Sequence, residues 1–475
     1  MRIALRWIFA IHRYIGIGLG LLMLMWCLSG IVMMYVPYPS LSGAARQAGL
    51  QRLDLGQCCI VPSGGGPPSF SVEMIHGRLL LYGGKTLVDL RTGHEAGGIT
   101  PADARASAER FARGNSLAAT RMTLETIGSD QWTVSGGFRH DRPLYKFSLN
   151  DKAGTRLYVS SATGKVVQRV TASQRFWNYL GAVPHWLYFT RLRADPLLWG
   201  QVVIWTSLLG SFLVATGLYI GIRQWWVARG VGRWSPYRGF ALWHHLPGLL
   251  FGVFLLSWIV SGLLSMNPWG LLEGDNRPDT GALRGPPATF ARIGAALRAA
   301  SNTERAADIV SLASAPLNGK LYLIATGRDG RRRRLDAAGQ RAPLTQADIA
   351  FIAHAILHAP AARPSLVPDG DDYHFAQDGT GPSLPVLRLI AANGDRFYID
   401  PVSGEPVAAF GAADRGYRWL FQGLHRLDFT AAMRTRPGWD VMMLVLLTGA
   451  SSVAATGVYL GLRHIGRLMA RRVDR

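Results

Sequence analysis

Four long stretches of the sequence contain no charged side chain. They run from Tyr14 to Val36, from Leu197 to Ile222, from Leu246 to Met266 and from Val441 to Leu462. As a helix, each stretch is long enough to cross a hydrocarbon core of about 30 Å. The first is too long for a signal peptide and is not followed by a small-residue cleavage site. The pattern therefore predicts an integral membrane protein whose four transmembrane α-helices lie in a lipid bilayer.

Arginines set the expected orientation of these helices. The N-terminal tail carries Arg2, Arg6 and Arg13, the segment after the second stretch holds four arginines and no acidic residue, and the C-terminal tail holds five arginines against Asp474. Short basic segments stay in the cytoplasm, so we expect both termini inside and the two long segments outside. The predicted organisation is a tail with helix 1 (1–36), an outer region (37–196), helix 2 (197–222), a cytoplasmic basic loop (223–245), helix 3 (246–266), a second outer region (267–437), helix 4 (438–462) and a cytoplasmic basic tail (463–475).

The net charge of +21 is explained largely by this topology, so it does not indicate a nucleic-acid partner. For the run Arg331 to Arg334 we favour a solvated turn or strand end over an anion-binding patch.

The three cysteines give little further information. Cys27 is expected to pack inertly within helix 1, while Cys58 and Cys59 are adjacent on the oxidising side. A redox role for that adjacent pair stays open. No C-x-x-C-H motif is present, which excludes covalent haem attachment.

The sequence contains an internal duplication. ATGLYIGIR (215–223) nearly repeats as ATGVYLGLR (455–463), and HRYIGIGLGLLMLMWCLSG (12–30) aligns with HHLPGLLFGVFLLSWIVSG (244–262) through its opening H-x-x-x-G and closing Ser-Gly. Helix 1 therefore corresponds to helix 3, and helix 2 to helix 4. Because each half begins and ends inside, we predict two tandem parallel repeats.

The outer segments are duplicated as well. YVSSATGKVV (158–167) matches YIDPVSGEPV (398–407), and 86–98 and 333–343 are weaker copies of the same strand–turn–strand unit. A glycine-containing turn between β-prone runs indicates a hairpin. Residues 101–113 and 346–357 show helical spacing of apolar residues. We predict outer α+β modules, two in each half.

Four histidines fall in register across the duplication, at two depths of the membrane. His12 and His244 lie at the cytoplasmic ends of their helices and are called the inner pair here; His185 and His425, the outer pair, precede helices 2 and 4. Haem iron takes ligands on both faces of the ring, commonly neutral imidazole, and helical bundles build cofactor sites from facing helices. We therefore predict two b-type haems, one at each pair.

Other histidines are weaker candidates. His245 aligns with Arg13 and is therefore less suited than His244 as a ligand. His354 and His358 have metal-compatible spacing but no third ligand, so a surface helix is favoured. For His374 we favour a solvated loop.

The order of these motifs resembles the PepSY-associated transmembrane family. The similarity rests on H-x-x-x-G opening helices 1 and 3, on LHRLDF (424–429), on TGxY near the ends of helices 2 and 4, and on the PepSY-like turns DLRTG, SATGK and PVSGE. The resemblance implies a bacterial inner-membrane location, periplasmic PepSY-like regions and haem b at the inner and outer pairs. It also implies electron flow to a periplasmic ferric siderophore. In contrast to the LHRLDF motif, His185 lies in VPHWLYF, without the arginine and aspartate.

These observations favour a di-haem ferric-siderophore reductase. No strand–G-x-G-x-x-G–helix signal is present, so the electron donor is expected to be another protein, a quinol or a soluble reduced cofactor. The alternative is a haem-free membrane anchor whose PepSY modules bind or inhibit a periplasmic protein. A transporter ranks last, because the middle of each helix lacks charged residues. We expect Arg426 and Asp428 to contact a haem propionate or the backbone near His425, and Trp199 and Trp439 to lie in the aromatic belt.

Overall fold

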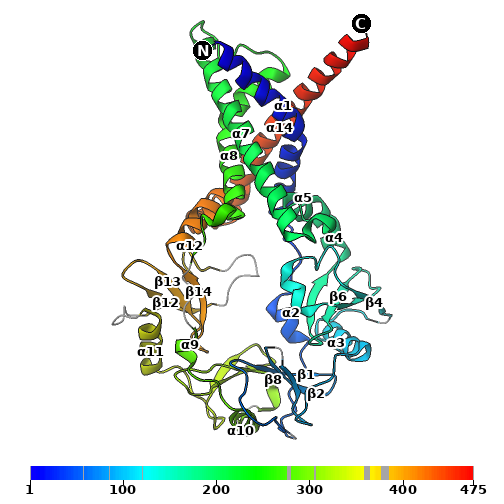
Figure 1. Cartoon of the computed structure of the whole chain (residues 1–475), viewed down its shortest axis with the longest axis vertical. Coiled ribbons are helices and arrows are strands. Elements are labelled where there is room, and N and C mark those ends of the chain that lie inside the picture. The colour runs from blue at the N-terminus through cyan, green and yellow to red at the C-terminus, as the bar shows by residue number, and fades with distance from the viewer. Residues whose placement is uncertain are drawn as a thin grey trace. The chain divides into compact units, whose positions relative to one another are not determined.

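The chain folds into two compact units, each assembled from both halves of the sequence (Figure 1). The computed structural model describes residues 2–56, 58–84, 86–119, 121–274, 280–303, 306–357, 364–375 and 384–473. One unit, called the helical unit, comprises Met1–Tyr38, Ser173–Glu273 and Ala413–Arg475. The other, called the sheet unit, comprises Pro39–Ala172 and Gly274–Ala412. The two predicted outer regions therefore fold together rather than as separate domains.

The helical unit contains four helices that are long and apolar enough to cross a membrane. They are α1 (Arg2–Met33), α7 (Pro196–Arg229), α8 (Phe240–Ser265) and α14 (Gly438–Val473). All four extend beyond at least one predicted limit, and the predicted basic tail is a continuation of α14. Charged residues mark where a helix leaves the lipid, but they do not stop helical hydrogen bonding. The sharp start of α7 has a local cause, because the Asp195 carboxylate accepts hydrogen bonds from the Leu197 and Leu198 amides.

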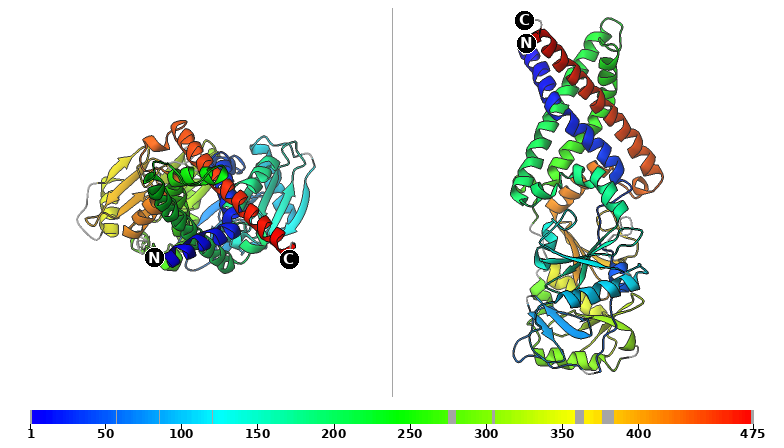
Figure 2. Two further views of the ribbon diagram at one scale, coloured as in Figure 1. Left: turned by 90° about the horizontal axis from the view of Figure 1, so that it is seen from above. Right: turned by 90° about the vertical axis from the view of Figure 1, so that its right-hand side faces the viewer.

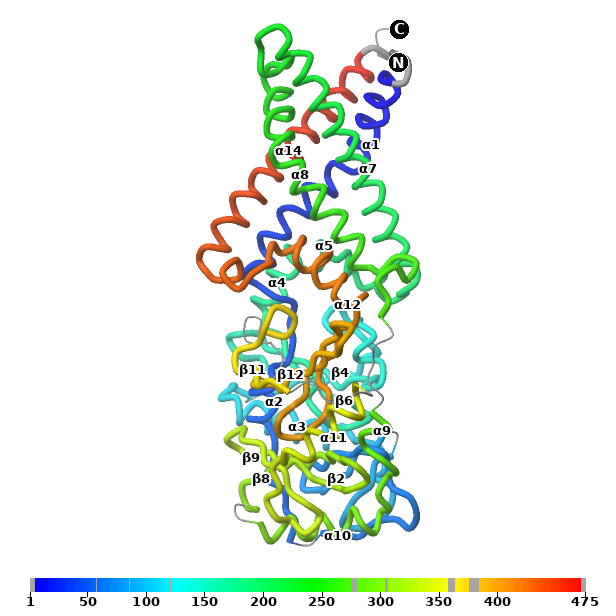
Figure 3. Tube along the Cα trace, turned by 90° about the vertical axis from the view of Figure 1, so that its left-hand side faces the viewer, coloured from blue at the N-terminus to red at the C-terminus, as the bar shows by residue number. Residues whose placement is uncertain are grey.

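These four helices form a bundle in which α1 and α8 are diagonally opposed. Both α1 and α8 pack against α7 and α14. The start of α1 and the end of α14 lie at the same end of the bundle (Figure 2), and the crossing of the helices is visible along the trace in Figure 3. The bundle interior is apolar and includes Met23, Leu213, Leu255 and Ala450. Cys27 is buried in this core, as expected for a packing residue.

Short helical segments precede α7 and α14 in corresponding positions. Those before α7 are α4 (Ala172–Leu180), α5 (Ala182–His185) and α6 (Thr190–Arg193). Those before α14 are α12 (Ala412–Tyr417), η4 (Arg418–Gly423), α13 (Leu424–Arg426) and η5 (Ala432–Arg434). A further short segment, η2 (Pro268–Gly270), follows α8. These segments carry His185 and His425, which therefore lie outside the long helices.

A six-stranded antiparallel sheet joins the two halves of the chain within the sheet unit. Its order is β10-β9-β8-β1-β2-β3, and the β1–β8 pairing aligns Ser71 with Ala313 and Val72 with Leu312. The strands are β1 (Ser71–Ile75), β2 (Arg78–Gly83), β3 (Thr86–Asp89), β8 (Ile309–Ser314), β9 (Leu323–Gly327) and β10 (Arg332–Leu335). Helix α10 (Phe290–Ala300) contributes to the same core, in which Ile293 and Leu297 are fully buried.

Two four-stranded antiparallel sheets complete the unit, with the same strand order. They are β4-β5-β6-β7, comprising β4 (Thr123–Ile127), β5 (Leu144–Ser148), β6 (Arg156–Ser160) and β7 (Val166–Val170), and β11-β12-β13-β14, comprising β11 (Ser365–Val367), β12 (Val386–Ile390), β13 (Arg396–Ile399) and β14 (Pro406–Phe410). The remaining segments are α2 (Gly43–Ala48), α3 (Pro101–Gly114), η1 (Gly136–Asp141), α9 (Thr280–Arg284), η3 (Ala306–Asp308) and α11 (Gln346–Leu357). The predicted hairpins at 158–167 and 398–407 and the helices at 101–113 and 346–357 are confirmed.

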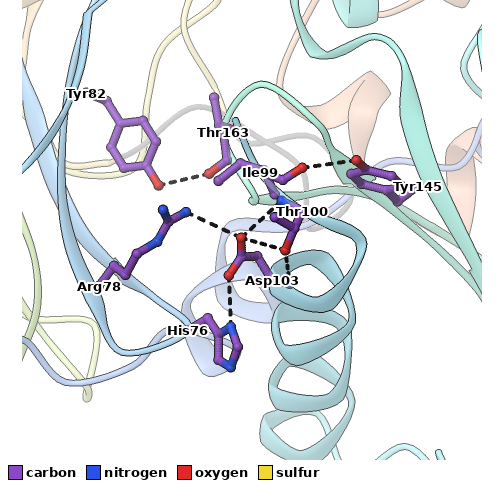
Figure 4. Close-up of polar contacts among 8 residues, drawn as sticks. All are labelled: His76, Arg78, Tyr82, Ile99, Thr100, Asp103, Tyr145 and Thr163. Carbon is purple, nitrogen blue, oxygen red and sulfur yellow. Dashed lines mark hydrogen bonds and ion pairs between the residues drawn. The ribbon is translucent and has the colours of Figure 1, made fainter. Parts of the chain in front are cut away.

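The start of α3 is fixed by a polar cluster around Asp103 (Figure 4). Thr100 and Asp103 form a reciprocal capping box, and the Asp103 carboxylate also accepts hydrogen bonds from His76 Nδ1 at 2.8 Å and from Arg78 at 3.4 Å. Burial alone raises the pKa of Asp103, but the hydrogen bonds from Thr100 and His76 outweigh it and hold that pKa below its usual range. The cluster therefore ties the β1–β2 turn to the helix.

Several polar predictions for the sheet unit can now be compared with the structure. Three residues of the arginine run, from Arg332 to Arg334, belong to β10. Arg332 pairs with Asp400, while Arg334 is buried, pairs with Asp348 and lies over the Tyr322 ring. The run therefore lies at a strand end, one of the two predicted settings, but the burial and pairing of Arg334 differ from the solvated environment expected. His374 is also not in a solvated loop, because it is buried and stacks on Tyr398 at 4.8 Å.

Two further groups were singled out by the sequence. Cys58 and Cys59 are joined by a disulfide. His354 is exposed on α11, as a surface helix predicts, whereas His358 lies outside the described residues.

Candidate functional site

The bundle brings His12 and His244 together from diagonally opposed helices. His12 lies on α1 and His244 on α8, and their ring centroids are 6.3 Å apart. Both side chains are partly buried. The inner pair therefore faces inward across the bundle rather than toward lipid.

Backbone carbonyls hold both rings of the inner pair by the same nitrogen. His12 Nδ1 lies 3.1 Å from the Leu213 carbonyl oxygen on α7, and His244 Nδ1 lies 3.0 Å from the Val453 carbonyl oxygen on α14. A carbonyl oxygen only accepts hydrogen bonds, so Nδ1 carries the proton in each ring. Nε2 is then the unprotonated nitrogen, which is the form that binds a metal.

A glycine makes room for each ring. A Cβ atom on Gly217 would stand 2.6 Å from His12 Cε1, and one on Gly457 would stand 3.1 Å from His244 Cε1. A side chain at Gly217 would force the His12 ring to move, and one at Gly457 would press on the His244 ring.

The outer pair repeats this design with different supports. His185 on α5 and His425 on α13 have ring centroids 6.1 Å apart. His185 Nδ1 lies 3.1 Å from both the Trp26 carbonyl oxygen and Ser29 Oγ on α1. His425 Nδ1 lies 3.1 Å from the Trp258 carbonyl oxygen and 3.0 Å from Ser261 Oγ on α8. The pattern again leaves Nε2 as the free ring nitrogen.

The glycines of the outer pair follow these serines. A Cβ atom on Gly30 would lie 3.6 Å from His185 Cε1, and one on Gly262 would lie 3.6 Å from His425 Cε1. The closing Ser-Gly of the two aligned sequence stretches therefore contacts the histidines directly.

Burial keeps the outer histidines neutral. It lowers the pKa of His185 to about 4. It lowers the pKa of His425 to about 3, with a further contribution from the neighbouring His185. Both imidazoles are therefore uncharged near neutral pH, as metal ligation requires.

The spacing within each pair would suit two imidazoles that share one metal. With a metal–nitrogen bond of about 2.0 Å, two such rings would have their centroids separated by twice that length plus the distances from each nitrogen to its ring centre, roughly 6–6.5 Å in all. The measured values are 6.3 and 6.1 Å. Hydrogen bonding of the second ring nitrogen to a carbonyl is the usual support of a metal-bound histidine. The chemistry of these residues, two neutral imidazoles each with an unprotonated Nε2, would therefore suit haem iron.

A family model described as PepSY-associated TM region matches residues 9–316. The chain belongs to the PepSY-associated TM family. The match covers well over half of the chain, includes His12, His185 and His244, and ends before His425. No curated protein matches the sequence.

His245 in this PepSY-associated TM protein has no ring nitrogen left for a metal. Its Nε2 lies 2.9 Å from the Gly221 carbonyl oxygen and its Nδ1 lies 2.8 Å from Ser235 Oγ. These contacts tie α8 to α7 and to the segment between them. His244 is thus the better ligand candidate, in line with the sequence alignment.

Two tryptophans support the segments that carry the outer pair. Trp199 Nε1 donates to the Trp186 carbonyl at 2.9 Å, and Trp439 Nε1 donates to the Arg426 carbonyl at 2.7 Å. Each acceptor directly follows one of the outer histidines. The alignment of Trp199 with Trp439 in the sequence pointed to a shared role, but the aromatic-belt interpretation did not include these hydrogen bonds.

The segment around His425 contains an ion pair that has no counterpart among the described residues around His185. Arg418 Nη1 donates to Asp428 Oδ1 at 2.7 Å, and both side chains are almost fully buried. A second bond, to the Asp428 carbonyl, is 3.0 Å long. Asp428 is therefore held in a buried ion pair with η4, and the expected contacts of Arg426 and Asp428 with a haem propionate stay predictions.

Proposed function

We propose that this membrane protein holds two b-type haems and reduces ferric iron bound to siderophores in the periplasm. The observation that carries the proposal is the pair of matched sites, each with two facing imidazoles anchored through Nδ1. One haem would be held by His12 and His244, and the other by His185 and His425. The protein would thus be an oxidoreductase of the bacterial inner membrane.

The chemistry follows from the number of ligands. Iron with two imidazole ligands has no open coordination position, so such a haem supplies one-electron transfer rather than oxygen activation. The chain's own contribution is to fix the rings: four carbonyls hold the tautomer, and Gly217 and Gly457 leave space for the rings of the inner pair. The apolar interior around Met23, Leu213 and Leu255 keeps water away from the path between the two depths.

The supports recur between the halves of the chain, which favours a tandem parallel repeat. The Leu213 contact of His12 recurs 240 residues later as the Val453 contact of His244. The Trp26 contact of His185 recurs 232 residues later, as the Trp258 contact of His425. Packing of the helices alone does not require that all four histidines, each with its carbonyl contact, occur at equivalent positions in both halves.

The direction of electron flow follows from the topology that the arginines predict. With both termini in the cytoplasm, the inner pair lies at the cytoplasmic face and the outer pair at the periplasmic face. One electron arrives from a protein, quinol or reduced soluble cofactor and leaves to one ferric ion. The resulting ferrous ion is held less tightly by the hard oxygen ligands of a siderophore, and it is thereby released.

The test is the reoxidation of the dithionite-reduced, detergent-purified protein by a ferric siderophore under anaerobic conditions. Stopped-flow spectra should show loss of the reduced b-type absorption in step with formation of ferrous iron, captured by a ferrous chelator. The gallium complex of the same siderophore is the matched control, since its metal cannot accept an electron. Reoxidation at equal rates by both complexes, or none by either, contradicts the siderophore reductase. A protein that binds no haem leaves the PepSY-presenting anchor as the better account.

A further inference from the structure

Two tryptophans in the bundle carry buried indole N–H groups without a hydrogen-bond partner. Trp258 is only 7% exposed, Trp26 is partly buried, and Nε1 of each has no acceptor among the described residues. Buried indole N–H groups normally find a partner, and a membrane interior offers no water in its place. An orphaned donor is thus unusual, and here it occurs at both aligned positions.

Both tryptophans lie on the helix face that contacts the outer pair. Trp258, Ser261 and Gly262 are spaced i, i+3 and i+4 and therefore share one face of α8, and both Ser261 and Gly262 contact His425. Trp26 precedes Ser29 and Gly30 on α1 in the same way, with His185 as the neighbour.

The direction of the helices places both indoles on the side of the outer pair that faces the inner pair. Helical side chains lean toward the N-terminus of their helix, and the N-terminal part of α8 carries His244. Trp258 lies about 21 Å along the helix from His244, but only about 5 Å from Ser261. The same relation holds for Trp26 on α1, whose N-terminal part carries His12. The two donors therefore belong to the outer pair and not to the inner one.

We propose that Trp26 and Trp258 line the outer haem site and that their unpartnered indole N–H groups would donate to the propionate carboxylates of a haem held between His185 and His425. The inference rests on the proposed haem function and deepens it by adding two positioning residues. An N–H dipole directed at the site opposes the positive charge that oxidation adds there. Loss of the N–H therefore favours the oxidised state and lowers the midpoint potential of the outer haem.

The experiment is a spectroscopic redox titration of Trp26→Phe and Trp258→Phe in a His12→Ala background, which keeps only the outer haem. Phenylalanine retains an aromatic ring without the N–H. A typical net hydrogen bond changes an equilibrium by roughly two- to tenfold. We expect the reduced-to-oxidised ratio to fall about fivefold for each variant, equivalent to a midpoint lowered by about 40 mV for a one-electron couple. Trp205→Phe is the matched control, because Trp205 is 53% exposed and its Nε1 already donates to Gln201.

Midpoints equal to that of the Trp205→Phe control overturn the inference while leaving the haem function intact. A second measurement does not depend on redox potentials or on haem retention by the variants. Ultraviolet resonance Raman spectra are recorded for the haem-loaded and the haem-free protein, and the Trp258→Phe variant assigns the indole band of Trp258. The Trp258 N–H should be hydrogen-bonded only in the loaded protein. An identical band with and without haem contradicts the proposal. Absence of haem from the unsubstituted protein refutes the proposed function itself, a result distinct from both of these.

Discussion

Replacing Gly217 by alanine should destroy the inner site while leaving the helices and the outer site in place. The added Cβ would stand 2.6 Å from His12 Cε1 and 3.2 Å from His12 Nδ1, closer than non-bonded carbon atoms approach. The backbone of α7 is locked into the bundle, so the imidazole must move instead. Movement of the ring breaks its 3.1 Å hydrogen bond to the Leu213 carbonyl and turns Nε2 away.

Two costs at the site add to give the magnitude. Overpacking costs about 1–3 kcal/mol, and the lost hydrogen bond about 0.5–1.5 kcal/mol. Alanine gains about 1 kcal/mol over glycine as a helix former in water, and that gain stabilises α7 rather than the site. Ligation at the inner pair should weaken by about 2–4 kcal/mol, or roughly thirty- to several-hundred-fold in haem affinity. The thermal stability of the helices should change little.

The assay is haem per chain in purified protein, determined by pyridine haemochrome, together with the reduced-minus-oxidised spectrum. Gly217→Ala should lose about one haem. The equivalent Gly457→Ala should lose part of one, because the contact there is 3.1 Å. Gly30→Ala and Gly262→Ala meet ordinary contacts of 3.6 Å and should retain both haems. Gly18→Ala is the control on α1, since its Cβ would meet nothing within 4 Å.

The order of these effects is the critical result. Full haem content in Gly217→Ala would refute the argument that His12 must occupy the space beside this glycine. Equal losses at all four glycines would show that haem retention reports general packing of the bundle rather than the geometry at each histidine.

Three further perturbations test separate parts of the structure. Arg418→Met should cost about 3–5 kcal/mol in a thermal melt, because Asp428 is left buried and unpaired, and adding Asp428→Leu should restore most of the loss. Ser261→Ala should leave haem content unchanged, since His425 keeps the Trp258 carbonyl. Burial raises the pKa of Asp371, but hydrogen bonds from Arg388 and backbone amides outweigh it and lower the pKa. Its stabilisation is complete above about pH 4 and lost as the pH falls further. The melting temperature should therefore drop below that pH, less steeply in Asp371→Asn.

The sequence predicted the elements that depend on local pattern. Charge-free runs located the four long helices, and glycine turns located the hairpins around Gly164 and Gly404. The limits of the helices were less predictable, because Arg463 and the residues after it continue α14 outside any apolar run. A charged side chain that reaches water is compatible with a helix, so charge marks the membrane boundary better than the helix end.

Long-range contacts were beyond the sequence pattern. The pairing of β1 with β8, which merges the two outer regions into one sheet, depends on which strand edges meet and leaves no periodic signal. The burial of His374 under Tyr398 depends likewise on tertiary packing.

In the candidate site, too, the sequence identified residues but not the contacts between them. Alignment of the halves found all four histidines. It also contained the two Ser-Gly pairs and the glycines Gly217 and Gly457, but it could not show that these residues contact the histidine rings. Their roles follow only from the helix that each one faces. Trp199 and Trp439 were visible as an aligned pair, yet an interfacial tryptophan is so common that the pairing alone did not indicate a hydrogen bond to the neighbouring histidine segment.

The most direct test of the central claim is the haem content of the intact, detergent-purified chain, expressed with ample haem and measured beside His12→Ala and His425→Ala. The account predicts about two b-type haems per chain, with one lost from each variant and the spectrum of the remaining haem preserved. A colourless protein, or haem retained in full by both variants, would contradict it.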